Sequence, residues 1–277
     1  SSGQFLTGVS ETEAASSGRG RPPAGNRNGF EGILWVSRTD ARWRDIPEKY
    51  PSGSTCWRHL QIWEEEGVWI EAWRALLGML DEWALLDWKE TFLNATFIPA
   101  KKGATQLDHK AGKGTKLAVL VERHGVPLGV SVAASPKGDT KLAIPTITEV
   151  QSAGFEDELT RTIADRGYDC DQLRLDFGVV GVVGVDLIVP HRRHRTRPAM
   201  QDRRKLRPYK GRWIVERSNS WLQAFRQVVM RQDRLLSSYR GFVHLACLMI
   251  GLGISEAGLS SPLNKWPRGQ RAAGMRL

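Results

Sequence analysis

The sequence predicts a mixed α/β fold, in which a mixed sheet flanked by helices follows a small all-helical region. Two observations favour this fold class. Between Phe30 and Leu86 the apolar residues recur with helical spacing, whereas after Trp88 short segments rich in β-branched and aromatic residues follow one another. Eight of the 11 tryptophans also lie between residues 35 and 88, so the composition changes where the periodicity changes. We therefore expect a domain boundary between residues 87 and 88.

The first region, residues 30–87, resembles a small DNA-binding unit. Its expected helices run from residue 33 to the turn at 45–47, from a cap at Ser54 or Thr55, and over 68–86. Three short helices with tight connections are typical of a helix-turn-helix, and Arg58 would then lie on the second helix as a DNA contact. A helical cap that only packs its tryptophans is the alternative.

The second region, residues 88–255, is expected to contain the sheet. The expected strands cover 91–98, 117–122, 126–133, 162–164 and 185–189, and the expected helices cover 142–151, 209–230 and 242–252. His124 and Gly125 join two of these strands as a hairpin. Hairpin-linked strands followed by alternating helices and strands are typical of a mixed sheet covered by helices.

The two ends of the chain lack periodicity. Residues 1–29 are rich in Gly, Ser, Pro and Arg and predict a flexible tail, and residues 256–277 predict a loose C-terminal tail. Arg19 and Arg21 lie in an extended Arg/Gly/Pro stretch that could enter a narrow DNA minor groove. A plain linker explains that stretch equally well.

The net charge of +10 is concentrated in one segment. Residues 1–85 carry −3, whereas residues 192–240 carry +12. Such a tract indicates a polyanionic partner, because each Lys or Arg placed on a phosphate releases condensed counterions. A solvated surface that aids solubility is the alternative.

Other classes of protein are disfavoured by composition. The best apolar run, 242–254, is shorter than the roughly 18 residues of a membrane span, and the first ten residues do not resemble a secretory signal. Cys56, Cys170 and Cys247 are odd in number and scattered, so a reducing, cytoplasmic setting is expected. The 41 % of hydrophobic and 25 % of charged residues exclude wholesale disorder.

Two carboxylates are candidates for catalysis. Asp165 directly follows a short apolar strand, so it would leave the strand end into a crevice. Glu216 shares one face of a predicted helix with Tyr209 and Arg212, although Arg212 and Glu216 could also form an ordinary i,i+4 ion pair. Phosphodiester chemistry with two Mg²⁺ ions needs a third acid on the first strand, and that position is Asn94.

Several motifs together give the chain a resemblance to a known family. They are Gly18-Arg-Gly-Arg-Pro-Pro, Ala95-Thr-Phe-Ile-Pro-Ala-Lys-Lys-Gly, Ala164-Asp-Arg-Gly-Tyr-Asp, Pro190-His-Arg-Arg, Arg212-Trp-Ile-Val-Glu-Arg and Tyr239-Arg-Gly-Phe-Val-His-Leu-Ala. From about Gly18 to Leu252 the chain resembles the DDE transposases of bacterial insertion sequences, specifically the insertion-sequence-five family. Each motif alone is weak, and their combination is specific.

The resemblance implies a ribonuclease-H-like core that cuts and joins DNA. Its acids would be the residue at 94, Asp165 and Glu216, holding two Mg²⁺ ions or Mn²⁺. Its partners would be double-stranded DNA, both terminal inverted repeats and target DNA, bound by a homodimer in a synaptic complex. Tyr209, Arg212 and Glu216 match a signature of the wider group, whereas the basic residue expected seven positions later is Gln223.

The departure at Asn94 predicts an inactive or nearly inactive protein. Asn keeps the shape of Asp and one carbonyl oxygen but removes the negative charge that a divalent ion needs. The chain would then be a deliberately inactivated variant or a decayed copy. A transposase-derived DNA-binding protein or repressor, and a nuclease acting on RNA or hybrids, are the alternative functions.

Other basic residues are expected to contact DNA because of where they lie in the chain. These predicted DNA contacts are Lys101 and Lys102 after the first strand, and Arg192, Arg193, Arg195, Arg203, Arg204 and Lys205 in the basic tract.

Overall fold

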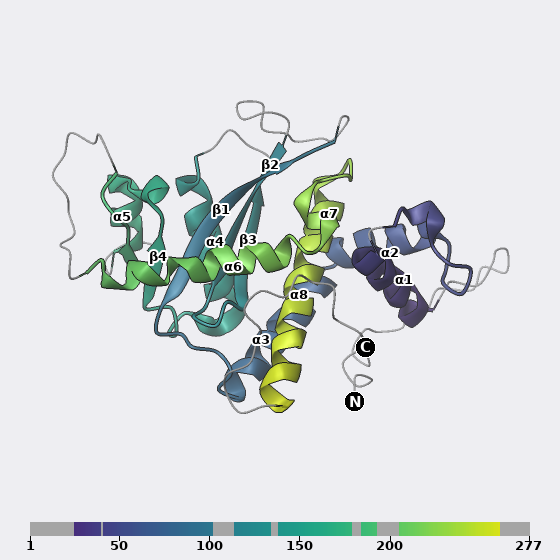
Figure 1. The fold of residues 1–277 in the computed structure, drawn as a ribbon, viewed down its shortest axis with the longest axis horizontal. Coiled ribbons are helices and arrows are strands. Elements are labelled where there is room, and N and C mark those ends of the chain that lie inside the picture. Colours follow the sequence, from purple (N-terminus) through teal and green to yellow (C-terminus); the bar gives the residue numbers. More distant parts are fainter. Residues whose placement is uncertain are drawn as a thin grey trace.

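The computed structural model describes residues 25–39, 41–101, 114–133, 138–178, 184–192 and 205–260, with side chains as far as residue 255. A helical region lies beside a sheet that has helices on both faces (Figure 1). The predicted fold class is therefore confirmed.

The N-terminal helical region contains the three predicted helices with shifted ends. These are α1 (Asn26–Thr39), α2 (Gly53–Glu65) and α3 (Val68–Glu82), with a short 3-10 turn, η1 (Trp43–Asp45), between the first two. The cap of α2 is Ser52, whose Oγ accepts a hydrogen bond from the backbone N of Thr55 at 3.3 Å, so the prediction of Ser54 or Thr55 is wrong. Helix α1 begins inside the segment that was predicted to be a flexible tail.

Five strands form one mixed sheet in the order β3-β2-β1-β4-β5. Their bounds are β1 (Thr91–Pro99), β2 (Gly114–Val121), β3 (Pro127–Ala133), β4 (Arg161–Ala164) and β5 (Asp186–Ile188). The pairs β1–β2 and β2–β3 are antiparallel, whereas β1–β4 and β4–β5 are parallel. This is the ribonuclease-H-like arrangement, and all five strands were predicted to within three residues.

Helices cover both faces of this sheet. Helix α4 (Thr140–Val150), which continues into a π-helical turn, η2 (Gln151–Phe155), packs on β2 and β3. Gly129 permits this approach, because a Cβ there would meet a Val150 methyl group at 2.5 Å. On the opposite face, α6 (Trp213–Leu222) crosses β1 and β2 (Figure 1). A 3-10 turn, η3 (Arg166–Tyr168), and α5 (Asp171–Phe177) follow β4.

The predicted single helix over 209–230 is wrong, because the segment is divided into three parts. They are the 3-10 helix η4 (Arg207–Arg212), then α6, then the short helix α7 (Arg226–Val229). Between α6 and α7 the backbone of Phe225 is extended. The following chain is held at the end of β1, where the backbone N of Arg231 donates to the carbonyl of Pro99 at 3.0 Å. A tertiary contact thus fixes the chain after α7, and neither Pro nor Gly lies between α6 and α7.

Helix α8 (Leu236–Ser260) belongs to two hydrophobic cores and is longer than the predicted 242–252. Its Tyr239 and Val243 lie in the core beneath the sheet, whereas its Phe242 and Leu245 complete the core of the helical region. By length and composition α8 could cross a membrane, which corrects the sequence-based estimate, but 67 % of its apolar window is buried inside the protein. Packing between two cores accounts for its apolar composition.

Helix α3 also contributes to the core beneath the sheet, through Trp73, Leu76, Leu77 and Leu80. The helical region and the sheet therefore share buried surface. The predicted division into domains at residues 87 and 88 stays a prediction.

Candidate active site

The strand register brings Asn94 and Asp165 together. The last residue pair between β1 and β4 is Leu93 with Ala164, so Asn94 and Asp165 occupy the next position on neighbouring strands. Asp165 has an extended backbone, which continues the direction of β4. Side chains alternate along a strand, so Asn94 shares the face of Phe92, the face that packs against Gly211 before α6. The two residues therefore lie where a strand end meets the covering helix.

Asp165 is half-buried and held by its own turn. Its Oδ1 accepts a hydrogen bond from the backbone N of Gly167 at 2.7 Å, which fixes the carboxylate at the start of η3. Among the described residues its second oxygen has no hydrogen-bond partner. One carboxylate oxygen is thus positioned by the backbone and the other is available to a ligand.

Arg212 pairs with Glu216 and is influenced by the charge of Asp165. Its guanidinium contacts Glu216 Oε1 at 3.0 Å and donates to the Tyr209 hydroxyl at 3.1 Å. Burial lowers the pKa of Arg212, but the hydrogen bond to Tyr209 and the charges of Asp165 and Glu216 outweigh burial and raise that pKa. Arg212 therefore lies in the field of both acids. The side chain of Glu216 is 57 % exposed, so it is open to a large ligand.

Asn94 supplies an uncharged oxygen at this site. It is half-buried, and its Oδ1 accepts a hydrogen bond from the backbone N of Ala95 at 3.0 Å. Within the described ranges, three or more His, Cys, Asp or Glu side chains never gather closely enough to hold a metal ion. Because Mg²⁺ binds through one or two carboxylates, waters and substrate phosphates, the donor set fits one such ion better than a pair.

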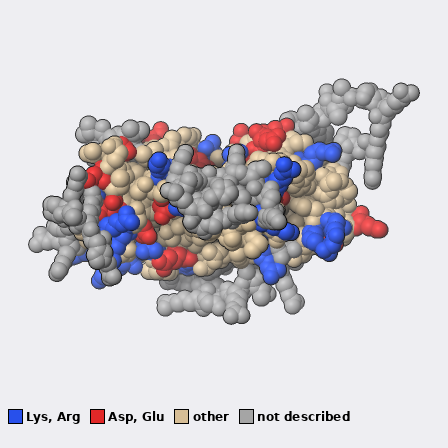
Figure 2. Space-filling view, turned by 90° about the horizontal axis from the view of Figure 1, so that it is seen from above, with Lys and Arg blue, Asp and Glu red and all other residues tan. Residues whose placement is uncertain are grey.

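The predicted DNA contacts are only partly within the described residues. Arg58 on α2, Lys101 after β1, Arg192 and Lys205 are all exposed, whereas Tyr209 and Arg212 are half-buried beside Glu216. Arg19, Arg21, Lys102, Arg193, Arg195, Arg203 and Arg204 lie outside the described residues. On the face shown in Figure 2, basic and acidic side chains are interspersed rather than segregated into a single patch.

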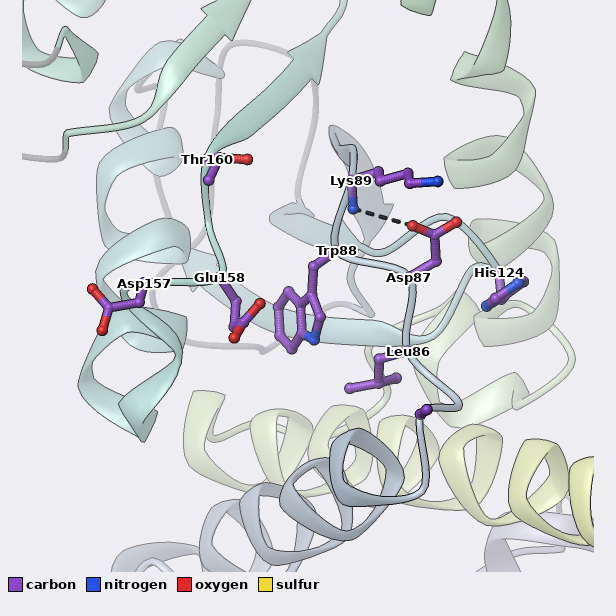
Figure 3. A pocket seen from close by; sticks show the side chains of 9 residues that line it. Leu86, Asp87, Trp88, Lys89, His124, Asp157, Glu158 and Thr160 are labelled. Atoms are coloured by element: carbon purple, nitrogen blue, oxygen red, sulfur yellow. Dashed lines mark hydrogen bonds between the residues drawn. The ribbon is translucent and has the colours of Figure 1, made fainter.

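Two clefts border the sheet at the opposite end from Asp165. One has a volume of about 460 Å³ and lies at the amino ends of β1 and β4, between Trp88, His124 and Glu158 (Figure 3). In it, Asp87 Oδ1 accepts a hydrogen bond from the backbone N of Lys89 at 3.1 Å (Figure 3). Neither Asn94, Asp165 nor Glu216 lines this cleft, so it is separate from the candidate site.

The second cleft has a volume of about 560 Å³ and extends along η4 and the start of α6. Arg123, Arg207 and Lys210 line it, together with the exposed Trp213. Arg123, Arg207 and Lys210 are not among the DNA contacts predicted from the sequence. The only signal for Arg207 and Lys210 was their membership of the basic tract, and nothing local indicated that Arg123 would join them.

Two family models match the chain. Residues 89–252 match the model described as "Transposase DDE domain", and residues 9–73 match the one described as "Putative transposase of IS4/5 family". Since the first covers more than half of the chain, the protein belongs to the DDE transposase family, as the sequence resemblance implied.

Particular relatives come from insertion sequences. The chain is 30 % identical over 138 residues to the "Putative transposase for insertion sequence element IS6501" of Brucella ovis, covering 50 % of this chain and 98 % of that protein. It is 39 % identical over 83 residues to the "Insertion element IS402 uncharacterized 16.2 kDa protein" of Burkholderia cepacia, covering 29 % of this chain and 56 % of that one.

Among solved structures, a pre-cleavage Mos1 transpososome is similar at 13 % identity and a TM-score of 0.28, covering 84 % of this chain and 81 % of that chain. A likeness of that size carries no argument about the site.

Proposed function

We propose that this protein is a DNA transposase that binds terminal inverted repeats and whose core is built for cleavage and strand transfer by phosphoryl transfer. The observation that carries the proposal is the ion pair of Arg212 with Glu216 in the field of Asp165, which stands beside position 94 on the neighbouring strand. Family membership and the +12 basic tract support it.

The residues have distinct roles in this proposal. Asp165 and Glu216 hold a divalent cation, Mg²⁺ or Mn²⁺, which when bound would neutralise charge on the phosphate and favour an attacking oxygen. Arg212 donates to a phosphate oxygen, and the Tyr209 hydroxyl keeps the guanidinium in place. Arg123, Arg207 and Lys210 line a separate cleft at the other end of the sheet, where their positive charges could contact a DNA backbone that extends past the site.

Asn94 makes the protein inactive or nearly so in this proposal. An amide oxygen lacks the charge with which a carboxylate binds a divalent cation, and here that oxygen already accepts a hydrogen bond from Ala95. DNA binding does not need that charge. The protein would therefore hold transposon ends, as a homodimer that pairs them, without cutting them.

Restoring the acid tests the proposed function. The Asn94→Asp variant is incubated with Mg²⁺ and end-labelled duplex carrying the inverted repeats that flank the gene, beside the unaltered protein and the Asn94→Asp/Glu216→Gln double variant. We expect cleavage by the single variant only. If the Asn94→Asp protein is folded and binds the duplex but does not cleave it, the proposed enzymatic function is ruled out.

Asn94 also favours a second candidate, a transposase-derived repressor that only binds DNA. Binding to repeat DNA, random DNA and RNA across a salt titration separates these functions from a nuclease of RNA or hybrids. A repressor would bind the repeat DNA more tightly than random DNA or RNA, and its Asn94→Asp variant would not cleave DNA. Equal affinity for all three ligands would remove the sequence-specific claim.

A further inference from the structure

Asp139 places a third carboxylate close to Asp165. It lies at the amino end of α4, but its side chain does not cap that helix. Instead, its Oδ1 receives Lys116 Nζ at 2.7 Å, and its Oδ2 is directed at Gly167. A Cβ on Gly167 would lie 3.5 Å from Asp139 Oδ2 and 2.8 Å from Asp165 Oδ1, so both carboxylates border the space that the missing side chain of Gly167 leaves open.

A buried hydroxyl belongs to Tyr168, the residue next to Gly167. Tyr168 is fully buried, and its hydroxyl has no hydrogen-bond partner within the part of the chain that the structure describes. Burial raises the pKa of Tyr168, and the negative charges of Asp139 and Asp165 raise it further, so both carboxylates lie near the hydroxyl. An unpartnered buried hydroxyl costs about 1–3 kcal/mol unless a ligand or water completes it.

We propose that Asp139 and Asp165 bind one divalent cation between them, with a cation-bound water donating a hydrogen bond to the Tyr168 hydroxyl oxygen. Two carboxylates with several retained waters are the usual protein ligands of Mg²⁺. Asp139 then supplies the charge that Asn94 lacks, from the α4 side of the sheet. The site itself is independent of DNA; only its use in phosphoryl transfer rests on the proposed function.

Lys116 competes with the cation for Asp139. Its ammonium group is 2.7 Å from Asp139 Oδ1 and its side chain is only 19 % exposed, so it partly neutralises the carboxylate. Removing Lys116 and removing Asp139 should therefore shift cation affinity in opposite directions. A failure to fold weakens binding in both variants, so it cannot imitate this pattern.

The test measures Mn²⁺ binding to the full chain without DNA, by the electron paramagnetic resonance of free Mn²⁺. We expect Asp139→Asn to weaken binding by about tenfold or more. We expect Lys116→Met to tighten binding a few-fold, and Gly167→Ala to weaken it by placing a methyl group between the carboxylates. The control Asp157→Asn removes the same charge from an exposed residue at the other end of the sheet and should leave affinity unchanged.

The salt dependence of Mn²⁺ binding distinguishes a direct ligand from a distant charge. If Asp139 binds the cation directly, its tenfold effect persists in about 0.5 M KCl, whereas a through-space effect is largely screened there. Unchanged affinity in Asp139→Asn, loss of the effect in salt, or no Mn²⁺ binding by the unaltered protein at millimolar concentration would each overturn the site. The proposed transposase function has its own test in cleavage by Asn94→Asp, so the two proposals fail separately.

Discussion

Restoring a carboxylate at position 94 should make the protein less stable without a divalent cation and more responsive to one. Asn94 and Asp165 stand at neighbouring positions on adjacent strands, which are about 4.8 Å apart. Two like charges about 5 Å apart repel by about 3 kcal/mol at an effective dielectric constant near 20. The charge of Arg212 offsets part of this repulsion. We therefore expect Asn94→Asp to lose about 1–3 kcal/mol of unfolding free energy in EDTA.

Thermal melting measures both halves of this prediction. For a chain of this size, 1 kcal/mol shifts Tm by about 2–4 °C, so the variant should melt about 2–12 °C lower in EDTA. Mg²⁺ at 100 times its Kd should then return about 2.7 kcal/mol. Asn28→Asp serves as the control, because it adds the same charge to an exposed position on α1. The reasoning is refuted if Asn94→Asp melts like the unaltered protein in EDTA and gains no larger shift from Mg²⁺.

Three further predictions concern buried contacts elsewhere in the fold. Glu64→Ala should cost about 3–5 kcal/mol in urea unfolding, because the buried Glu64 carboxylate bonds an arginine and a histidine on α8; a loss below 1 kcal/mol would contradict this. The Glu122 carboxylate raises the pKa of His124. The stability that this pair contributes is therefore complete below about pH 6.5 and is lost as the pH rises through the raised pKa. The difference in Tm between the unaltered protein and His124→Gln should accordingly shrink between about pH 5.5 and pH 8.5. Gly129→Ala should destabilise by about 1–3 kcal/mol through its clash with α4, whereas Gly78→Ala, which meets nothing within 4 Å on α3, should stabilise by about 0.5–1 kcal/mol.

The strands were predictable because their signals are local. β1 combines Thr, Phe and Ile in a nine-residue run, and β2 and β3 flank a Gly with positive φ, Gly125, at which a hairpin was expected. The order of helices and strands then restricts the possible topologies. The family motifs indicate Asp165 and Glu216 as candidate catalytic residues. The α6 face against β1 could be inferred as well, since Ile214 and Ser218 share one helical stripe.

The division of the predicted helix at 209–230 could not be read from sequence. Gln223 and Ala224 tolerate a helix, so local propensity favours continuation. The chain after α7 is held by fully buried Arg231, whose guanidinium donates to Thr115 Oγ1 at 3.0 Å and to the carbonyl of Arg234 at 2.8 Å. The bond to Thr115 joins the segment after α7 to β2, which is 116 residues away in the chain, and a local pattern cannot indicate such a contact.

No local pattern marks Asp139 as a ligand, for a related reason. Its position also bears on the effect of the missing carboxylate at Asn94. It precedes an ordinary helix by one residue, where an Asp most often caps the helix, and its 26-residue separation from Asp165 matches no metal-ligand motif. Only the parallel pairing of β4 with β1, which returns the chain to the amino end of α4, makes the two acids neighbours. If all the carboxylates at this edge of the sheet contribute negative charge to the site, and not only the three motif positions, then a substitution at one motif position weakens cation binding without abolishing it. The Asn94 protein would then keep one cation, held by Asp139 and Asp165, and lose the second.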